Sequence, residues 1–201
     1  MKTKEKILNQ ALDLFNTKGV ENITTRHIAA ALGISQGNLH YHYPTKNVVI
    51  ETLFHQFMED VKNAERYIET SFPKEEVILS MKDNYKIMYK YRFFFKDNEV
   101  VWRRLPSIES ITKQLFDLKK SQILHIIQLY KDQGIFREEI SQAQIEFLAE
   151  QFIFSITSWL SAKEYHEIKG DVSDYYARFT FRIWLPYLNE GEMEQWEALL
   201  N

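Results

Sequence analysis

The first 46 residues contain three short apolar periodic segments separated by chain breakers, and this feature constrains the fold more than any other. Gly19 and Gly33 follow the first two segments, and Pro44 follows the third. Glycine ends helices in the left-handed conformation, and the residue before a proline disfavours the helical region. The pattern therefore predicts a compact group of three helices. They are expected at Thr3–Thr17, from Thr24 or Thr25 to Gly33, and at Gln36–Tyr43.

The rest of the chain continues with helical periodicity in longer segments. Val49, Leu53, Phe57 and Val61 recur every four residues and predict a connecting helix that extends to Thr70, ended by Phe72 and Pro73. Only six Gly and four Pro occur in 201 residues, too few for the turns of a β-sandwich. We therefore predict an all-α fold. Further helices are expected at 75–96, 98–104, 108–133, 142–165, 172–189 and 192–200.

Charge is spread unevenly over two expected domains, a head at 1–46 and a body at 47–201 that begins with the connecting helix 47–70. Residues 1–46 carry six cations and three acids, a net charge of +3. Residues 138–201 carry four cations and twelve acids, a net charge of -8, although the whole chain is only at -3. A basic head on an acidic body is typical of a protein with one end facing phosphates. Chance fluctuation over short windows is the alternative.

Composition argues against several classes of protein. The chain has no Cys, which excludes disulfides, thiolate zinc sites and cysteine nucleophiles and fits a cytoplasmic location. No stretch approaches the roughly 18 to 20 apolar residues that a membrane-spanning helix requires. Asn9, Gln10 and Asp13 interrupt the region that would have to be apolar in a secretory signal. We expect a soluble cytoplasmic protein with no membrane partner.

Residues 24–43, TTRHIAAALGISQGNLHYHY, have the features of a helix-turn-helix. The small side chains of Ala29–Ala31 let the second helix cross the first closely, and Gly33 permits the tight turn between them. Ile34 and Leu39 are expected to fill the small core. The first turn of the second helix is polar and small, and that turn enters the major groove of DNA in this motif. These residues therefore predict an N-terminal DNA-binding domain.

The segment Lys4–Leu53 resembles the TetR family of transcriptional regulators. The resemblance rests on two threonines and an arginine, on Ile-Ala and Leu-Gly-Ile-Ser, and on GNLHYHYPTK at 37–46. It implies a homodimer that binds double-stranded operator DNA. The implied backbone contacts are Thr25, Arg26, Tyr41 and Lys46, and the residues implied to face the groove are Ser35, Gln36, Gly37 and Asn38.

Gln36 and Asn38 are the expected base readers, since a carboxamide can pair with adenine, and a phosphate contact is the alternative for each. Gly37 would let the backbone approach the DNA closely. His40 departs from the family pattern, which usually has Tyr at this position, and a protonated His40 could still bind phosphate. His42 and Tyr43 are expected to pack within the head.

An enzyme would have to use the histidines, and their spacing argues against it. Positions 40 and 42 differ by about 200° around a helix, whereas a zinc-binding pair needs i, i+4 spacing. The sequence contains neither a nucleophile elbow nor a phosphate loop. We expect no catalytic residues, no metal site and no cofactor.

The resemblance also implies two sites in the body. A small-molecule effector, apolar or aromatic, would enter among the middle helices, although most of the aromatic residues there are expected to be core. The candidate wall residues are Met88, Trp102, Phe116 and Ile123. Arg103 and Arg104 could instead meet an anionic effector, but adjacent arginines on a short helix more often face solvent or pair with acids such as Glu99 or Glu109.

The helices at 142–165 and 172–189 would form a four-helix dimer interface, with packing in their own monomer as the alternative. The candidate contacts are Phe152, Ile156, Trp159, Phe179 and Ile183. Dimerisation would set the recognition helices roughly 34 to 36 Å apart and require a palindromic operator. The expected function is a repressor that its effector releases. The alternatives are an activator, a regulator without an effector, and a helical interaction module without DNA affinity.

Overall fold

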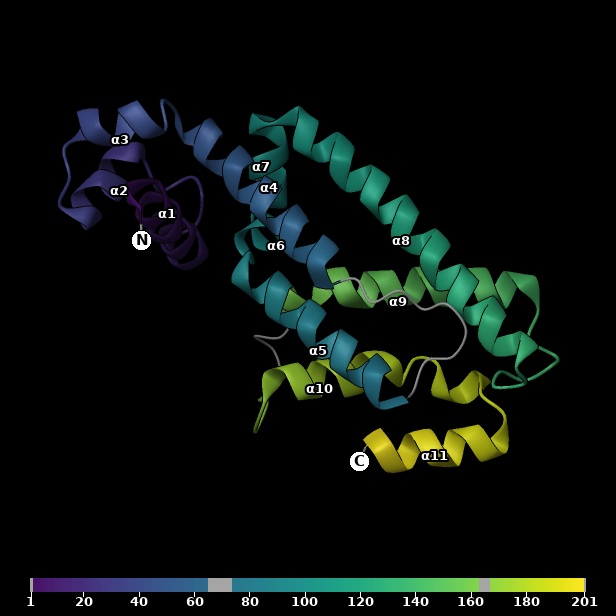
Figure 1. The fold of residues 1–201 in the computed structure, drawn as a ribbon. Helices are drawn as coiled ribbons and strands as arrows, with labels where there is room; N and C mark the ends of the chain where they lie inside the picture. Colours follow the sequence, from purple (N-terminus) through teal and green to yellow (C-terminus); the bar gives the residue numbers. More distant parts are fainter. Residues whose placement is uncertain (1, 65–73, 163–166, 201) are drawn as a thin grey trace. The chain divides into compact units, whose positions relative to one another are not determined.

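The computed structural model describes residues 2–64, 74–162 and 167–200, and most of them are helical (Figure 1). Within these ranges the sole β-type pairing is one antiparallel bridge between Phe136 and Leu188, so the predicted all-α fold is confirmed. The helices are α1 (Thr3–Lys18), α2 (Thr25–Leu32), α3 (Gln36–His42), α4 (Lys46–Ala64), α5 (Lys74–Lys90), α6 (Phe93–Lys96), α7 (Asn98–Arg104), α8 (Pro106–Asp132), α9 (Gln142–Ala162), α10 (Val172–Phe181) and α11 (Glu190–Leu200).

The chain divides into two compact units, of which the first is formed by Met1–Asn63 and Ile87–Thr112. In this unit α1 packs on α2 and α2 packs on α3, as the spacing of the apolar residues predicts. The apolar stripe of α1 is buried, and the same core continues into α6 and α7. Buried residues of this core include Ile7, Phe15, Ile28, Leu39, Ile50, Leu53, Phe93 and Val101. The second stretch of chain, 87–112, therefore shares a core with residues 1–63.

The second unit is formed by Ala64–Lys86 and Lys113–Asn201, and its core is rich in aromatic rings. The Phe181 ring stacks on the Trp196 ring with 3.7 Å between centroids. Tyr176 packs between Tyr85 and Trp159, and burial raises the pKa of its phenol. The division between the units falls at the end of α4, within α5 and within α8, whereas the domain division expected after residue 46 stays a prediction.

The helix predicted at 75–96 is interrupted, and Asn16 of α1 provides the reason. The helix ends at Lys90, and α6 begins at Phe93. The Asn16 side chain donates a hydrogen bond from Nδ2 to the Lys90 carbonyl oxygen at 2.8 Å and accepts one from the Phe93 N–H at 3.1 Å. These two bonds satisfy backbone groups on either side of the break, so the chain can turn without leaving them unpaired.

The helix predicted at 172–189 is also too long. It ends at Phe181 and is followed by a 3₁₀ turn at Leu185–Tyr187. Pro186 has no N–H to bond the Arg182 carbonyl oxygen, and its ring would clash with that carbonyl in an α-helix, which explains the early end. The predicted ends of two other helices cannot be compared, because 65–70, Phe72, Pro73 and 163–165 lie outside the described residues.

Helix α10 begins at a cap that should make the second unit sensitive to acid. The Asp171 carboxylate accepts hydrogen bonds from the Ser173 hydroxyl at 2.5 Å and from the N–H groups of Ser173 and Asp174 at 2.7 and 3.1 Å. The Ser173 hydroxyl, together with these backbone donors, lowers the pKa of Asp171 below its ordinary value of 3.8. A carboxyl group with a lowered folded-state pKa stabilises the fold above its unfolded pKa, and this contribution is lost as the pH falls through the folded pKa.

Replacing Asp171 by asparagine keeps a good capping side chain but removes the charge. We expect Asp171→Asn to unfold more readily than the wild type at neutral pH and the difference to shrink as the pH falls below about 4. Urea unfolding followed by circular dichroism at several pH values measures this. A difference that stayed constant over that range would contradict the assignment.

Candidate nucleic-acid interface

Helices α2 and α3 are held in a helix-turn-helix by local hydrogen bonds. The Thr24 hydroxyl caps α2 by accepting the His27 N–H at 3.3 Å, and His27 Nδ1 accepts the Thr24 N–H at 3.3 Å. Gly33 ends α2 with φ +65°, a left-handed conformation that favours glycine. The Ser35 hydroxyl then caps α3 by accepting the Asn38 N–H at 3.1 Å. The sequence therefore specifies both the turn and the start of the second helix.

The predicted groove-facing residues lie on an exposed surface of α3. Leu39 is completely buried and fixes this helix to the core, whereas the side chains of the first turn are exposed. Tyr41 is 84% exposed, an unusual position for a large aromatic ring. Tyr43 is buried, as expected, and burial raises its pKa. The exposed candidates are Ser35, Gln36, Gly37, Asn38, His40 and Tyr41.

Two other predicted contact residues also lie near this surface, at the start of α2. Thr25 is half-buried, and Arg26 is exposed. Arg26 Nε donates a hydrogen bond to Gln36 Oε1 at 3.2 Å. The residue predicted to bind phosphate is thus bound to one of the residues predicted to read bases, a contact that the sequence pattern did not reveal.

Lys46, the remaining predicted phosphate contact, is half-buried at the start of α4. Its ammonium group donates a hydrogen bond to the Val20 carbonyl oxygen. Desolvation and the nearby Arg104 lower the pKa of Lys46, and Glu21 partly opposes them. Because an ammonium group has three donors, Lys46 can keep the Val20 contact and still present an N–H to a phosphate.

Asp97, which sequence reasoning missed, also binds Val20, in the turn between α1 and α2. Its carboxylate accepts the Val20 N–H at 2.7 Å, so both backbone polar groups of Val20 are bound by charged side chains. Asp97 and Val20 are 77 positions apart, and no local pattern connects them. Asp97 thus joins the turn before α2 to the chain around α6, as Asn16 joins α1 to it.

The body residues predicted to line an effector site are divided between the two units. Met88 and Trp102 belong to the first unit, and Phe116 and Ile123 belong to the second. Met88 and Ile123 are buried. Phe116 contacts Phe154, with 6.0 Å between ring centroids. Their role as cavity walls stays a prediction.

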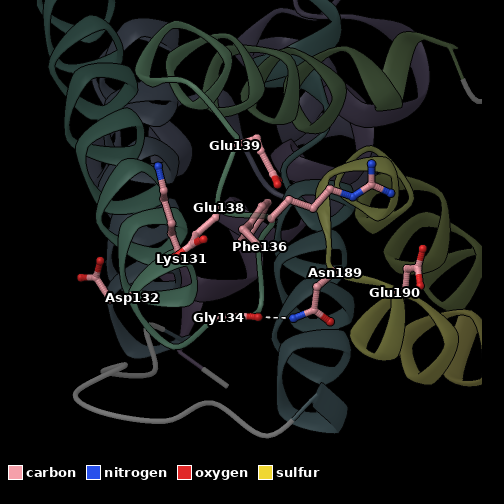
Figure 2. Close-up of a pocket in the computed structure, with 9 residues that line it drawn as sticks. Lys131, Asp132, Gly134, Phe136, Glu138, Glu139, Asn189 and Glu190 are labelled. Atoms are coloured by element: carbon pink, nitrogen blue, oxygen red, sulfur yellow. Dashed lines mark hydrogen bonds between the residues drawn. The ribbon is translucent and has the colours of Figure 1, made fainter.

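A charged pocket of about 790 Å³ lies in the second unit, where the chain leaves α8 and enters α11 (Figure 2). Lys131 Nζ donates to the Ile140 carbonyl oxygen at 2.9 Å, and Arg137 Nε donates to that of Leu188 at 2.9 Å. Both cations thus fix the backbone of the loop after α8 and of the chain before α11. None of the four predicted wall residues lines this pocket. The residues that do are Lys131, Asp132, Gly134, Phe136, Arg137, Glu138, Glu139, Asn189 and Glu190.

Of the five predicted dimer contacts, two are buried inside the second unit. Phe152 packs on Trp184 with 4.8 Å between ring centroids, and Trp159 packs on Tyr176. Ile156 and Ile183 are half-buried, and Phe179 is 38% exposed. The sequence pattern missed two strongly exposed rings of α9, Phe147 and Phe154, at 55% and 58% exposure.

Two further observations concern metal binding and membrane-spanning helices. Within the described part of the chain, no group of three or more His, Cys, Asp or Glu side chains is placed to hold a metal ion. The described helices also include none with the length and apolar composition needed to cross a membrane.

Comparison with known proteins gives consistent matches over both units. A family model described as bacterial regulatory proteins, tetR family, matches residues 7–57, and a model described as bacterial transcriptional repressor TetR matches residues 53–196. The negative transcriptional regulator IcaR of the biofilm operon icaADBC in Staphylococcus epidermidis is 29% identical over 93 residues. This match spans 46% of the chain and 44% of IcaR, less than half of that relative.

Two further matches extend over most of the chain. The nucleoid occlusion factor SlmA of Actinobacillus pleuropneumoniae is 24% identical over 180 residues, which cover 83% of the chain and 87% of SlmA. The crystal structure of a TetR-family transcriptional regulator from Marinobacter aquaeolei VT8 superposes with a TM-score of 0.87 and 26% identity, covering 100% of the chain and 98% of that structure. With a family model that matches more than half of its length and the helix-turn-helix described above, the chain belongs to the TetR family of DNA-binding transcriptional regulators.

Proposed function

We propose that the protein is a homodimeric, cytoplasmic repressor without catalytic activity, which binds a palindromic operator and is released from it by a small-molecule effector. The observation that carries the proposal is the surface of α3. Its first turn is capped by Ser35 and exposes Gln36, Gly37 and Asn38, while Leu39 anchors the helix in the core. Small polar side chains on a fixed helix fit direct readout in the major groove.

The proposed phosphate contacts flank this surface. Arg26 is exposed on α2, Tyr41 is exposed on α3, and Lys46 keeps ammonium donors free to contact phosphate at the start of α4. Thr25 and His40 complete the proposed set. Contacts of this kind fix the register of a protein on DNA and strengthen binding to every sequence alike.

The proposed dimer surface consists of the exposed rings of Phe147, Phe154 and Phe179. Phe147 and Phe154 are seven residues apart, about two turns, and so lie on one face of α9. Phe179 lies on α10, which packs on α9, and its ring contacts Trp159 with 5.1 Å between centroids. A two-fold interface between such helix pairs forms a four-helix bundle. Phe152 and Trp159 support this surface from inside instead of contacting the partner.

Selection of bound sequences from random duplex DNA at two salt concentrations tests the proposal. We expect the wild type to select a palindrome, Gln36→Ala to lose preference at one position of each half-site, and Lys46→Ala to weaken all sequences alike. Lys46→Ala removes one phosphate contact in each half-site, two in the dimer, so the slope of log affinity against log salt should also fall by about 1.8. Circular dichroism of each variant shows that the fold is kept.

Other outcomes favour other functions. No enrichment at low salt would contradict the proposal and favour a helical interaction module without DNA affinity. An effector acts only if it binds the released state more tightly than the DNA-bound state. A molecule that stabilises the protein at saturation without weakening operator binding would contradict the effector part.

A further inference from the structure

The hydrogen bond between Arg26 and Gln36 fixes the orientation of a carboxamide on the proposed reading surface. Arg26 is in the first turn of α2, and Gln36 is the first residue of α3, so the bond crosses the turn of the helix-turn-helix. Its donor is Arg26 Nε, and its length is 3.2 Å. A guanidinium group has only donors, so the atom of Gln36 that meets it must be the carbonyl oxygen. The amino group of Gln36 is therefore the free end of the carboxamide.

We propose that Arg26 is a positioning residue that makes Gln36 read guanine in preference to adenine, an inference that rests on the proposed function. Adenine presents one acceptor, N7, and one donor, the N6 amino group, in the major groove, whereas guanine presents two acceptors, N7 and O6. A freely rotating Gln matches adenine, because it offers a donor and an acceptor together. When the carbonyl oxygen of a Gln side chain is bound to a cation, the side chain presents mainly its amino donors to the base.

The positive charge of Arg26 also favours guanine over adenine. A guanidinium group beside Gln36 Oε1 makes the approach of the adenine amino group unfavourable and that of the guanine O6 favourable. The Nη donors of Arg26 stay available for the proposed phosphate contact. Both side chains are exposed and start from backbone fixed by the Thr24 and Ser35 caps, so the pair is formed before DNA arrives.

The test is a comparison of selected operators for the wild type, Arg26→Met, Arg26→Lys, Gln36→Ala and the double variant Arg26→Met/Gln36→Ala. The position read by Gln36 is the one whose preference disappears in Gln36→Ala. We expect guanine there in the wild type and a shift of the guanine-to-adenine ratio toward adenine by about tenfold in Arg26→Met. Arg26→Lys, which keeps the charge and a donor, should retain most of the guanine preference.

The double variant separates positioning from a general contribution to binding. If Arg26 acts through Gln36, Arg26→Met has no effect on base preference once Gln36 is alanine. A phosphate contact of Arg26 would change affinity for all sequences but not this ratio. The position read by Asn38 provides an internal control, because its preference should not change. Lys62→Met, which removes an exposed cation from the last turn of α4, should change no ratio.

Two results overturn the inference. One is a wild-type preference for adenine at the Gln36 position, and the other is an unchanged guanine-to-adenine ratio in Arg26→Met, each with the palindrome still selected. Absence of any selected sequence would overturn the proposed function itself, and the inference with it. The failure of the positioning role is therefore distinguishable from the failure of DNA binding.

Discussion

Replacing Phe93 by alanine is expected to lower the free energy of unfolding by about 3 to 5 kcal/mol and to abolish operator binding. Phe93 is 1% exposed, and its ring packs on Phe15 of α1 with 5.3 Å between centroids and on Phe94 with 4.0 Å. Removing the ring leaves a cavity between α1 and α6 and deprives α1 of its support. The DNA-binding helices rest on α1, so they should lose their fixed geometry.

Urea unfolding followed by circular dichroism measures the stability change, and titration of labelled operator measures binding. Phe93→Leu refills most of the volume and should recover most of both properties. The matched control is Leu79→Ala, which shortens an apolar side chain that is 42% exposed on α5 and should cost less than about 0.5 kcal/mol. If Phe93→Ala unfolded at the wild-type urea concentration and bound operator normally, the role of α6 in the head would be wrong.

The second large effect is expected at the proposed dimer surface. Replacing Phe147 and Phe154 together by glutamate should convert the protein to a monomer at micromolar concentration. Because the interface has two-fold symmetry, each substitution adds one carboxylate from each protomer to it. An unpaired buried charge is strongly unfavourable. A monomer holds only one half-site at a time, so operator affinity should fall by about 100-fold or more.

Size-exclusion chromatography with light scattering gives the mass, and the operator titration gives the affinity. Both rings are more than half exposed, so the monomer should keep its helical content. Leu79→Glu, which adds one negative charge at an exposed apolar residue outside this surface, should leave the dimer intact. A double variant that remains dimeric would show that copies associate through another surface.

The sequence predicts the elements whose signals are local. The starts of α2 and α3, the left-handed turn at Gly33 and the apolar stripe of α1 all depend on signals within a few residues, and the structure confirms them. The exposed position of Gln36 and Asn38 follows from the same local pattern.

Long-range contacts account for what sequence reasoning missed. The break after Lys90 depends on Asn16, and the turn at Val20 depends on Asp97, in each case across more than 70 residues. Some aromatic side chains of α9 are buried and others are exposed. All of them count equally as apolar residues when the sequence is read for periodicity. Periodicity alone therefore did not distinguish Phe152, which is buried, from Phe154, which is exposed.

The placement of residues 87–112 in the same compact unit as residues 1–63 has a consequence for building chimeric regulators. A fusion that exchanges only an N-terminal head for that of a relative would keep a foreign α6 and α7 beneath the new α1. The retained Lys90, Phe93 and Asp97 would then lose the contacts that Asn16, Phe15 and Val20 make with them. A functional hybrid of this protein should exchange both stretches together, so the module that recombines is discontinuous in the gene although it is continuous in space.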